Sequence, residues 1–153
     1  MKSILAIGFV SFVASIAMAA DPAPSIVGTW VLQKQECSSG VAEKGGLRTG
    51  QDTSKVTFAE DTTLEIHSVQ AGCEFVSKGS YLINGSLLTT TITSGRSCRM
   101  ADPVPSNETK TVFMIVINEN DFVTVATGAE AAKICPEGDA LIVHHQRAAN
   151  SPF

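Results

Sequence analysis

The sequence lacks the short motifs that mark most hydrolases and phosphate-binding enzymes. It contains no G-x-S-x-G, no H-E-x-x-H and no Gly-rich phosphate loop that leads into a helical segment. Serines and carboxylates are plentiful, but no recognisable pattern pairs a nucleophile with a base. We therefore expect no catalytic residues and no cofactor, and an enzyme is only the third hypothesis for this chain.

Basic residues are scarce as well. The chain has 11 Lys and Arg against 15 Asp and Glu, which gives a formal net charge of −4. Binding to nucleic acid depends on clustered Lys and Arg that release phosphate counterions. Neither such a cluster nor a basic amphipathic helix is visible, so we expect no nucleic-acid partner and no membrane-surface helix.

The spacing of metal ligands is also missing. No two cysteines are separated by the two to four residues that zinc sites use. His144 and His145 are adjacent in a segment that reads as a strand, where neighbouring side chains point to opposite faces. They cannot share one ion without distortion, so we expect no metal site.

Long apolar runs occur only at the start of the chain. Lys2 precedes an uncharged run from Ile4 to Met18, and small residues then lead to the polar break at Asp21. This order is typical of a signal peptide, here residues 1–20 with cleavage after Ala19 or Ala20. A retained anchor is the alternative, but the run is shorter than the roughly 20 residues that a spanning helix needs.

The rest of the chain, residues 21–153, is predicted to be one periplasmic or secreted domain without stable membrane insertion. It contains four cysteines, at positions 37, 73, 98 and 135. An even number of cysteines in an oxidising compartment indicates two disulfide bonds.

Almost no helical periodicity is present in this domain, which instead shows short runs of β-branched and aromatic residues between turn residues. We expect eight strands: Ile26–Glu36, Lys55–Ala59, Thr63–Ser68, Cys73–Ile83, Ser86–Ser94, Thr109–Asn118, Asp121–Thr127 and Ala140–Arg147.

The fourth and fifth strands form the clearest hairpin. Asn84-Gly85 between them favours a type I′ turn, because both residues accept positive φ. That turn would place Tyr81 opposite Leu88 and Ser77 opposite Ile92.

The connection around Glu60-Asp61 joins the second and third strands. A loop with an odd number of residues would set Phe58 opposite Leu64 and Val56 opposite Ile66. Because this pairing puts the apolar side chains on one face, we prefer it to a two-residue turn.

In an up-and-down meander the long connections share one end of the sheet, and all four cysteines map to that end. The fourth and fifth strands would bring Cys73 close to Cys98. The first and last strands meet only if the sheet closes, and closure would bring Cys37 close to Cys135. We predict these two pairings.

We predict an all-β fold, an eight-stranded antiparallel up-and-down barrel, because closure of the sheet removes its unpaired edges. An immunoglobulin-like sandwich is less favoured, because Trp30 precedes all four cysteines instead of lying between a bridged pair.

The start and end of the domain resemble the lipocalin family and its calycin relatives. Gly28-Thr29-Trp30 at the first strand resembles their G-x-W motif, and Arg147 stands where the family has a basic residue near the end of the last strand. The resemblance implies that Trp30 closes the barrel floor and that Arg147 packs across it. A cation–π contact of this kind contributes about 0.5–2 kcal/mol. Gly28, Trp30 and Arg147 are therefore expected to be structural.

The residues expected to line a ligand site follow from side-chain alternation. The inward face of the fourth and fifth strands would be apolar toward the tight turn and richer in hydroxyl groups toward the open end. If Trp30 points inward, the alternation also turns two charged side chains of the first strand into the mouth. The candidate ligand-binding residues are Lys34, Glu36, Phe75, Ser77, Tyr81, Thr90, Ile92 and His145. A buried structural contact of His145 with Tyr81 or a threonine is the alternative for that residue.

These features favour an exported lipocalin-like protein that binds a small apolar or amphipathic molecule. The alternative is a secreted inhibitor or interaction module that binds a partner enzyme through its loop-rich end, particularly the segment Ser38–Ser54 with Arg48.

Overall fold

The computed structural model describes residues 25–40, 52–100 and 102–149. The expected signal peptide, the loop residues 41–51 with Arg48 and the last four residues lie outside these ranges. Within them, no helix is long and apolar enough to cross a membrane.

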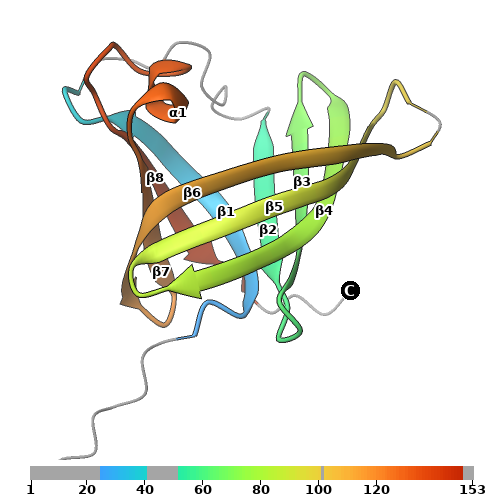
Figure 1. Ribbon diagram of the computed structural model, residues 1–153, viewed down its shortest axis with the longest axis horizontal. Coiled ribbons are helices and arrows are strands. Elements are labelled where there is room, and N and C mark those ends of the chain that lie inside the picture. The colour runs from blue at the N-terminus through green and yellow to red at the C-terminus, as the bar shows by residue number, and fades with distance from the viewer. Residues whose placement is uncertain (1–24, 41–51, 101, 150–153) are drawn as a thin grey trace, which may run out of the picture.

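The described residues form a closed antiparallel barrel in which each strand pairs with its neighbours in sequence and β1 pairs with β8 (Figure 1). This confirms the predicted eight-stranded up-and-down barrel. The elements are β1 (Gly28–Cys37), β2 (Thr53–Phe58), β3 (Thr63–Gln70), β4 (Cys73–Asn84), β5 (Leu87–Ser97), β6 (Val104–Asn118), β7 (Asp121–Ala126), α1 (Ala129–Ala132) and β8 (Leu141–Arg147).

Most strands begin and end within three residues of the predicted bounds, and two elements differ more from the sequence prediction. The strand β6 begins at Val104 instead of Thr109, although it then includes Pro105. Pro105 is tolerated because this part of β6 pairs with β5 alone, while β7 pairs with β6 only from Phe113 onward. The second difference is α1, a single helical turn within the connection that was expected to be a loop.

Strand register agrees with the prediction in one hairpin and differs in another. Phe58 lies opposite Leu64 and Val56 opposite Ile66, as expected from the apolar pattern. The β4–β5 turn, by contrast, is centred on Gly85-Ser86, so Tyr81 lies opposite Thr90 instead of Leu88. This shift of two residues leaves the predicted inward face unchanged.

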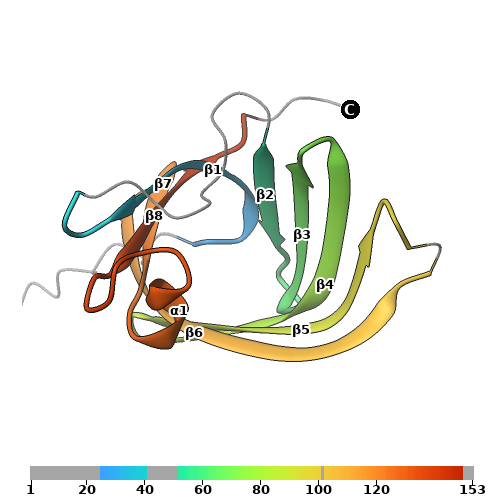
Figure 2. The same ribbon diagram turned by 90° about the horizontal axis from the view of Figure 1, so that it is seen from above.

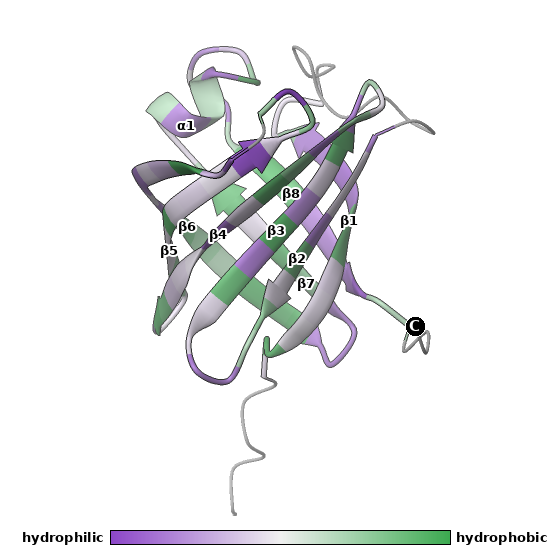
Figure 3. Ribbon diagram, turned by 90° about the vertical axis from the view of Figure 1, so that its right-hand side faces the viewer, coloured by the Kyte–Doolittle hydropathy of each residue, from purple (hydrophilic) through white to green (hydrophobic). Residues whose placement is uncertain are grey.

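A bulge at Thr93 interrupts the alternation of β5. The register shift there pairs Ser77 with Gly95 instead of Ile92, and it pairs Ser94 with Lys78. Ser94 therefore lies on the outer face of the barrel, whereas it was expected on the inner one. Along β3, which carries no bulge, hydrophobic and hydrophilic residues alternate as a half-buried strand requires (Figure 3).

The main core fills the end of the barrel that carries the tight turns. Trp30 is fully buried there, donates a 2.6 Å hydrogen bond from Nε1 to the Ile26 carbonyl, and meets the Phe122 ring edge-on at 4.6 Å. The Arg147 guanidinium carbon lies 4.2 Å from the centroid of the Trp30 ring. Arg147 also donates hydrogen bonds to the carbonyl oxygens of residues 25, 27 and 119. We call this end the floor.

Gly28 makes room for the cation above the indole. Its φ is 128°, and a Cβ atom placed on it would lie 2.4 Å from Nη1 of Arg147. Any larger residue would strain the backbone and displace the guanidinium from Trp30.

Both disulfide pairings were predicted correctly. Cys37 is bonded to Cys135 and Cys73 to Cys98, with Cα separations of 5.6 and 5.4 Å. Both bonds lie at the end of the barrel opposite the floor, because the cysteines lie at or near the ends of strands that the long connections join. They are compatible with an oxidising compartment.

Candidate binding site at the open end of the barrel

Exposure of the inward-facing residues increases along the barrel axis. At the floor, Leu64, Leu88 and Met114 are buried. At the opposite end the inward-facing Phe75 and Val104 are 37% and 51% exposed. The inner face thus changes from a packed core at the floor to a solvent-accessible surface at the opposite end.

The register of β4, β5 and β6 defines the exposed part of this surface. Pairing places Phe75 opposite Ser97, Thr90 opposite Lys110 and Ile92 opposite Glu108. These side chains share a face with Tyr81, which packs into the core. We call the resulting group the mouth: Phe75, Ser77, Thr90, Ile92, Val104, Glu108 and Lys110.

The other half of the open end is closed by a small apolar cluster. Ala131 of α1 is fully buried against the Cys37–Cys135 bond and Leu141. In Figure 2, α1 lies at this end beside β8 and β6. The opening is therefore asymmetric, with β7, β8 and β1 covered and the inner faces of β4–β6 accessible.

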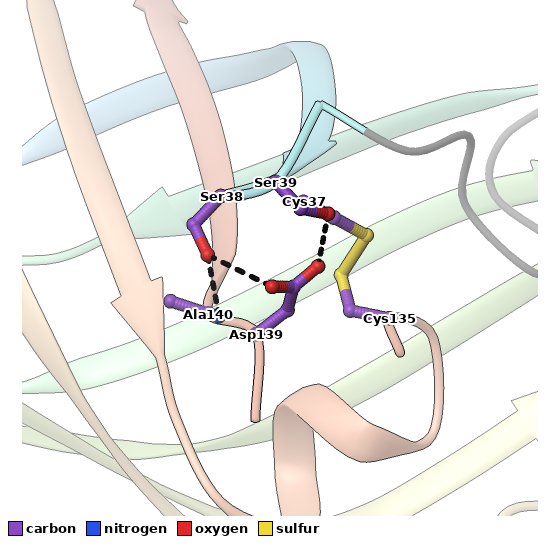
Figure 4. The surroundings of a disulfide bond; sticks show 6 residues. All are labelled: Cys37, Ser38, Ser39, Cys135, Asp139 and Ala140. Atoms are coloured by element: carbon purple, nitrogen blue, oxygen red, sulfur yellow. Dashed lines mark hydrogen bonds between the residues drawn. A yellow bond between two sulfur atoms is a disulfide. The ribbon is translucent and has the colours of Figure 1, made fainter. Parts of the chain in front are cut away.

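A hydrogen-bonded corner supports the covered half (Figure 4). The hydroxyl groups of Ser38 and Ser39 both donate to the Asp139 carboxylate. The backbone N–H of Ala140 donates to the Ser38 hydroxyl at 3.0 Å, and the backbone N–H of Ser38 donates to the Ala140 carbonyl at 2.9 Å. These bonds fix the segment before β8 to the end of β1, next to the disulfide.

Charged side chains at the border of the mouth form a series of ion pairs in which positive and negative charges are equal in number. Lys110 Nζ lies 3.0 Å from Glu108 and 3.9 Å from Glu130 of α1, and Lys133 lies 2.6 Å from Glu130. The hydrogen bond from Lys133 lowers the pKa of Glu130, and Glu130 in turn raises the pKa of Lys133. With two positive and two negative groups, this rim favours a neutral or zwitterionic polar group over a strongly charged one.

His145 lies between the floor and the mouth. Its ring stacks on Phe122 with a centroid distance of 4.4 Å, and Nε2 lies 3.2 Å from the Thr124 hydroxyl. Nδ1 is buried and has no hydrogen-bond partner among the described residues. Burial, followed by the charge of His144, lowers the pKa of His145 to about 4, so the ring is neutral at pH 7.

Lys34 and Glu36 do not point into the mouth, contrary to the sequence prediction. A bulge between Leu32 and Lys34 shifts the β1–β8 register, so Lys34 lies opposite His144 and Glu36 opposite Ile142. Both side chains therefore lie on the outer face, where Glu36 contacts Lys34 and accepts a 2.9 Å hydrogen bond from His144. The hydrogen bond from Lys34, followed by that from His144, lowers the pKa of Glu36.

Tyr81 faces inward as predicted, but it belongs to the floor. Its hydroxyl donates a 2.8 Å hydrogen bond to the Ala59 carbonyl, and its ring meets Phe58 edge-on at 4.9 Å. Burial, followed by the charge of Asp61, raises the pKa of this phenol. Its polar atom is already satisfied by the protein.

Sequence reasoning missed the contribution of β6 to the mouth. Val104, Glu108 and Lys110 continue the even-numbered positions that carry the core residues Val112 and Met114. That continuation was the available signal, but the strand was expected to begin only at Thr109, which left Val104 and Glu108 outside it.

Grooves also occur on the outer face. One of them, of about 800 Å³, crosses β1, β2 and β3 beside Thr29, Lys55 and Glu74. His67 in this groove contacts Glu65 and Glu74, so its ring is held by carboxylates. Among the described residues, no group of His, Cys, Asp and Glu could hold a metal ion.

The chain matches no protein-family model, no curated protein and no solved structure. The fold itself defines a class, the closed eight-stranded antiparallel barrels with disulfide-bonded loops. Function has to be inferred from the mouth.

Proposed function

We propose that this chain is an exported, lipocalin-like binding protein that holds a small apolar or amphipathic molecule in its mouth. The observation that carries the proposal is the exposure of Phe75 and Val104 on the inner face of a barrel whose floor is closely packed. Apolar side chains on a concave inner surface beside a few polar groups are typical of small-molecule sites. The proposal includes no catalytic step.

The lining indicates how such a molecule would be oriented. Its apolar part would contact Ile92, Phe75 and Val104, while a neutral or zwitterionic end would reach Lys110 and Glu108 at the rim. Below the mouth, the unpaired Nδ1 of His145 offers a hydrogen bond to a polar atom of the ligand or to water. An unpaired buried polar atom costs about 1–3 kcal/mol, and such a contact would recover part of that cost.

Export is part of the proposal. The two disulfide bonds are compatible with an oxidising compartment, and the sequence of residues 1–20 is typical of a signal peptide. A periplasmic or secreted barrel would meet amphipathic molecules released from membranes or taken up from outside the cell.

Two tryptophan substitutions on neighbouring residues of β5 test the proposal. Thr90 faces the mouth and Thr91 faces outward, where its hydroxyl bonds to Thr109. We expect dansyl-labelled lysophosphatidylcholine, a zwitterionic amphipath, to bind the wild-type chain. Thr90→Trp should weaken binding about 10-fold or more by filling the mouth, whereas Thr91→Trp should change it about twofold at most. Absence of saturable fluorescence with the wild-type chain, or equal effects of both variants, would contradict the proposal.

A second candidate is an interaction module that binds a partner enzyme through the loop-rich end. The observation in its favour is the rigid corner at Ser38, Asp139 and the Cys37–Cys135 bond. Most of the loop expected to enter a cleft lies outside the described residues. The Thr90→Trp variant distinguishes the two candidates, because a module that binds through its loops keeps its affinity for the partner when the mouth is filled.

A further inference from the structure

The strand β6 is apolar on both faces along its second half. Val112, Met114 and Val116 face inward and pack in or against the main core. The alternate residues Phe113, Ile115 and Ile117 face outward and are 51%, 57% and 60% exposed. An antiparallel strand with one solvated face normally alternates apolar with polar residues, and a continuous apolar run is typical of a strand covered on both sides. The described residues leave the outer side of β6 uncovered.

Neighbouring strands extend this surface. Leu87 lies directly opposite Phe113, and the cross-strand row continues through Val125 of β7 to Ile142 of β8. Leu82 of β4 is 64% exposed and lies opposite Thr89, two positions along β5 from Leu87. We call the exposed group the outer apolar face: Leu82, Leu87, Phe113, Ile115 and Ile117.

Threonine pairs border the outer apolar face. The hydroxyl groups of Thr89 and Thr111 are 2.9 Å apart, and those of Thr91 and Thr109 are 3.1 Å apart. None of these threonines and none of the five apolar residues carries a charge. Asp121 lines the same outer groove as Ile117, so one carboxylate lies at the edge of this surface.

We propose that the outer apolar face binds the same face of a second copy of this chain. A surface without charge offers nothing to steer an oppositely charged partner. Two chains that each carry a net negative charge can meet on an uncharged face while their charged faces stay apart. The two-fold symmetry of such a contact places apolar and threonine rows of one copy against those of the other.

Strand pairing determines the geometry of the contact. From Phe113 to Val116, β6 is hydrogen-bonded to β7, and its residue Phe113 is also paired with β5. No free edge is available at Phe113, so the second copy cannot add a strand there. The contact that we propose therefore packs the two sheets face to face, with the outer side chains between them.

The available area fits a reversible dimer. Five side chains that each expose about half of roughly 150–200 Å² offer about 400–500 Å² of apolar surface. A standard interface buries about 800 Å² per partner, of which a little over half is nonpolar. The outer apolar face together with the threonine pairs has this size and composition, so we expect a dissociation constant on the order of micromolar.

Sedimentation equilibrium of the oxidised chain from about 1 to 100 µM tests the proposal, because a micromolar dimer dissociates within this range. We expect a monomer–dimer equilibrium for the wild-type chain. In the double variant Phe113→Thr with Ile115→Thr, the introduced threonines are β-branched and suit a strand. We expect this variant to weaken association at least 10-fold. Leu82→Thr, on another strand, should weaken it by a smaller factor and serves as a second variant if the first does not fold.

Val104→Thr is the matched control. Val104 lies on the same strand and is equally exposed, but it faces the mouth, so its substitution should leave the dimer unchanged. A wild-type chain that is monomeric throughout the range overturns the proposal, as does a dimer that the double variant does not weaken. A monomer that floats with phosphatidylcholine vesicles would assign the face to a lipid surface instead and would also overturn it.

Discussion

At the scale of single residues, the adjacent histidines of β8 show how strand alternation assigns different chemistry to neighbours. His144 points outward and contacts the Glu36 carboxylate, while His145 stacks on Phe122 inside the barrel. The outer imidazole contacts a carboxylate, and the inner one is kept neutral by burial.

Replacement of His145 should change how stability depends on pH. The pKa of His145 is about 4 in the folded chain and about 6.5 when exposed. The unfolded state therefore takes up a proton before the folded state does, and stability falls as pH drops from about 6.5 to about 4, with no further loss from this group below that. The full difference corresponds to roughly 3 kcal/mol. His145→Phe, which keeps the stacked ring, should remove this part of the pH dependence.

Urea unfolding of the wild-type chain and the variant between pH 7 and pH 4 measures this effect. Carboxylates also contribute at the acid end, so the quantity to compare is the difference between the two proteins at each pH. His144→Gln is the control on the outer face, and it should leave in place the larger part of the His145 contribution, which burial causes. A wild-type minus variant difference that does not change across this range would contradict the assigned burial of His145.

At the scale of elements, the β4–β5 pair depends on a close approach of two backbones. A Cβ atom on Gly79 would lie 2.0 Å from the carbonyl oxygen of Thr91. This approach lies next to the bulge at Thr93, where the twist of the pair increases. Gly79 allows this close approach because it has no side chain, and for the same reason it contributes no side chain to the core.

Gly79→Ala should therefore destabilise the barrel by more than about 2 kcal/mol, because the contacting atoms belong to the backbone and cannot rotate away. Gly95→Ala is the control, since the nearest atom to its Cβ would be 3.7 Å away, an ordinary contact. Thermal unfolding of both variants measures the difference. Similar melting temperatures for the two would show that the strands can separate at Gly79 at little cost.

Strand registers, the bulge in β1 and the helix α1 show which parts of the fold could be predicted from the sequence. The apolar pattern around Phe58 and Leu64 fixed their register, because only one loop length places both on the same face. At Gln33 and Lys34 both residues are polar, so nothing in the sequence shows that a bulge turns Lys34 outward. The helix α1 is only four residues long, too short for a periodic signal. The mouth was thus predicted on β4 and on β5 up to Ile92, where alternation is regular, and missed on β6.

At the scale of the whole molecule, the two disulfides differ in the length of chain that they enclose. Cys37–Cys135 joins residues 98 positions apart and holds α1 over the open end, whereas Cys73–Cys98 spans 25 positions within one strand pair. The pairing of both was predictable because barrel closure and one hairpin brought the cysteines together.

Removal of the longer bridge should destabilise the fold more. In the chain-entropy model the two bridges contribute about 5 and about 3.5 kcal/mol respectively. The double variants Cys37→Ala with Cys135→Ala and Cys73→Ala with Cys98→Ala allow the comparison by urea unfolding. Hydrogen exchange should in addition show faster exchange of the amides around Ala131 in the first variant only. A larger loss from the second pair would mean that local strain outweighs loop length.

The pairing of β1 with β8 has one more consequence. It brings Ser25 and Ala148 together beneath the indole, where Arg147 bonds to the Ser25 carbonyl and the Ala148 amide bonds to the Thr29 carbonyl. A tether, tag or fusion partner attached before Ser25 or after Ala149 would thus leave the domain from one pole. An immobilised copy would present the opposite pole, with its aperture, to the surrounding solution.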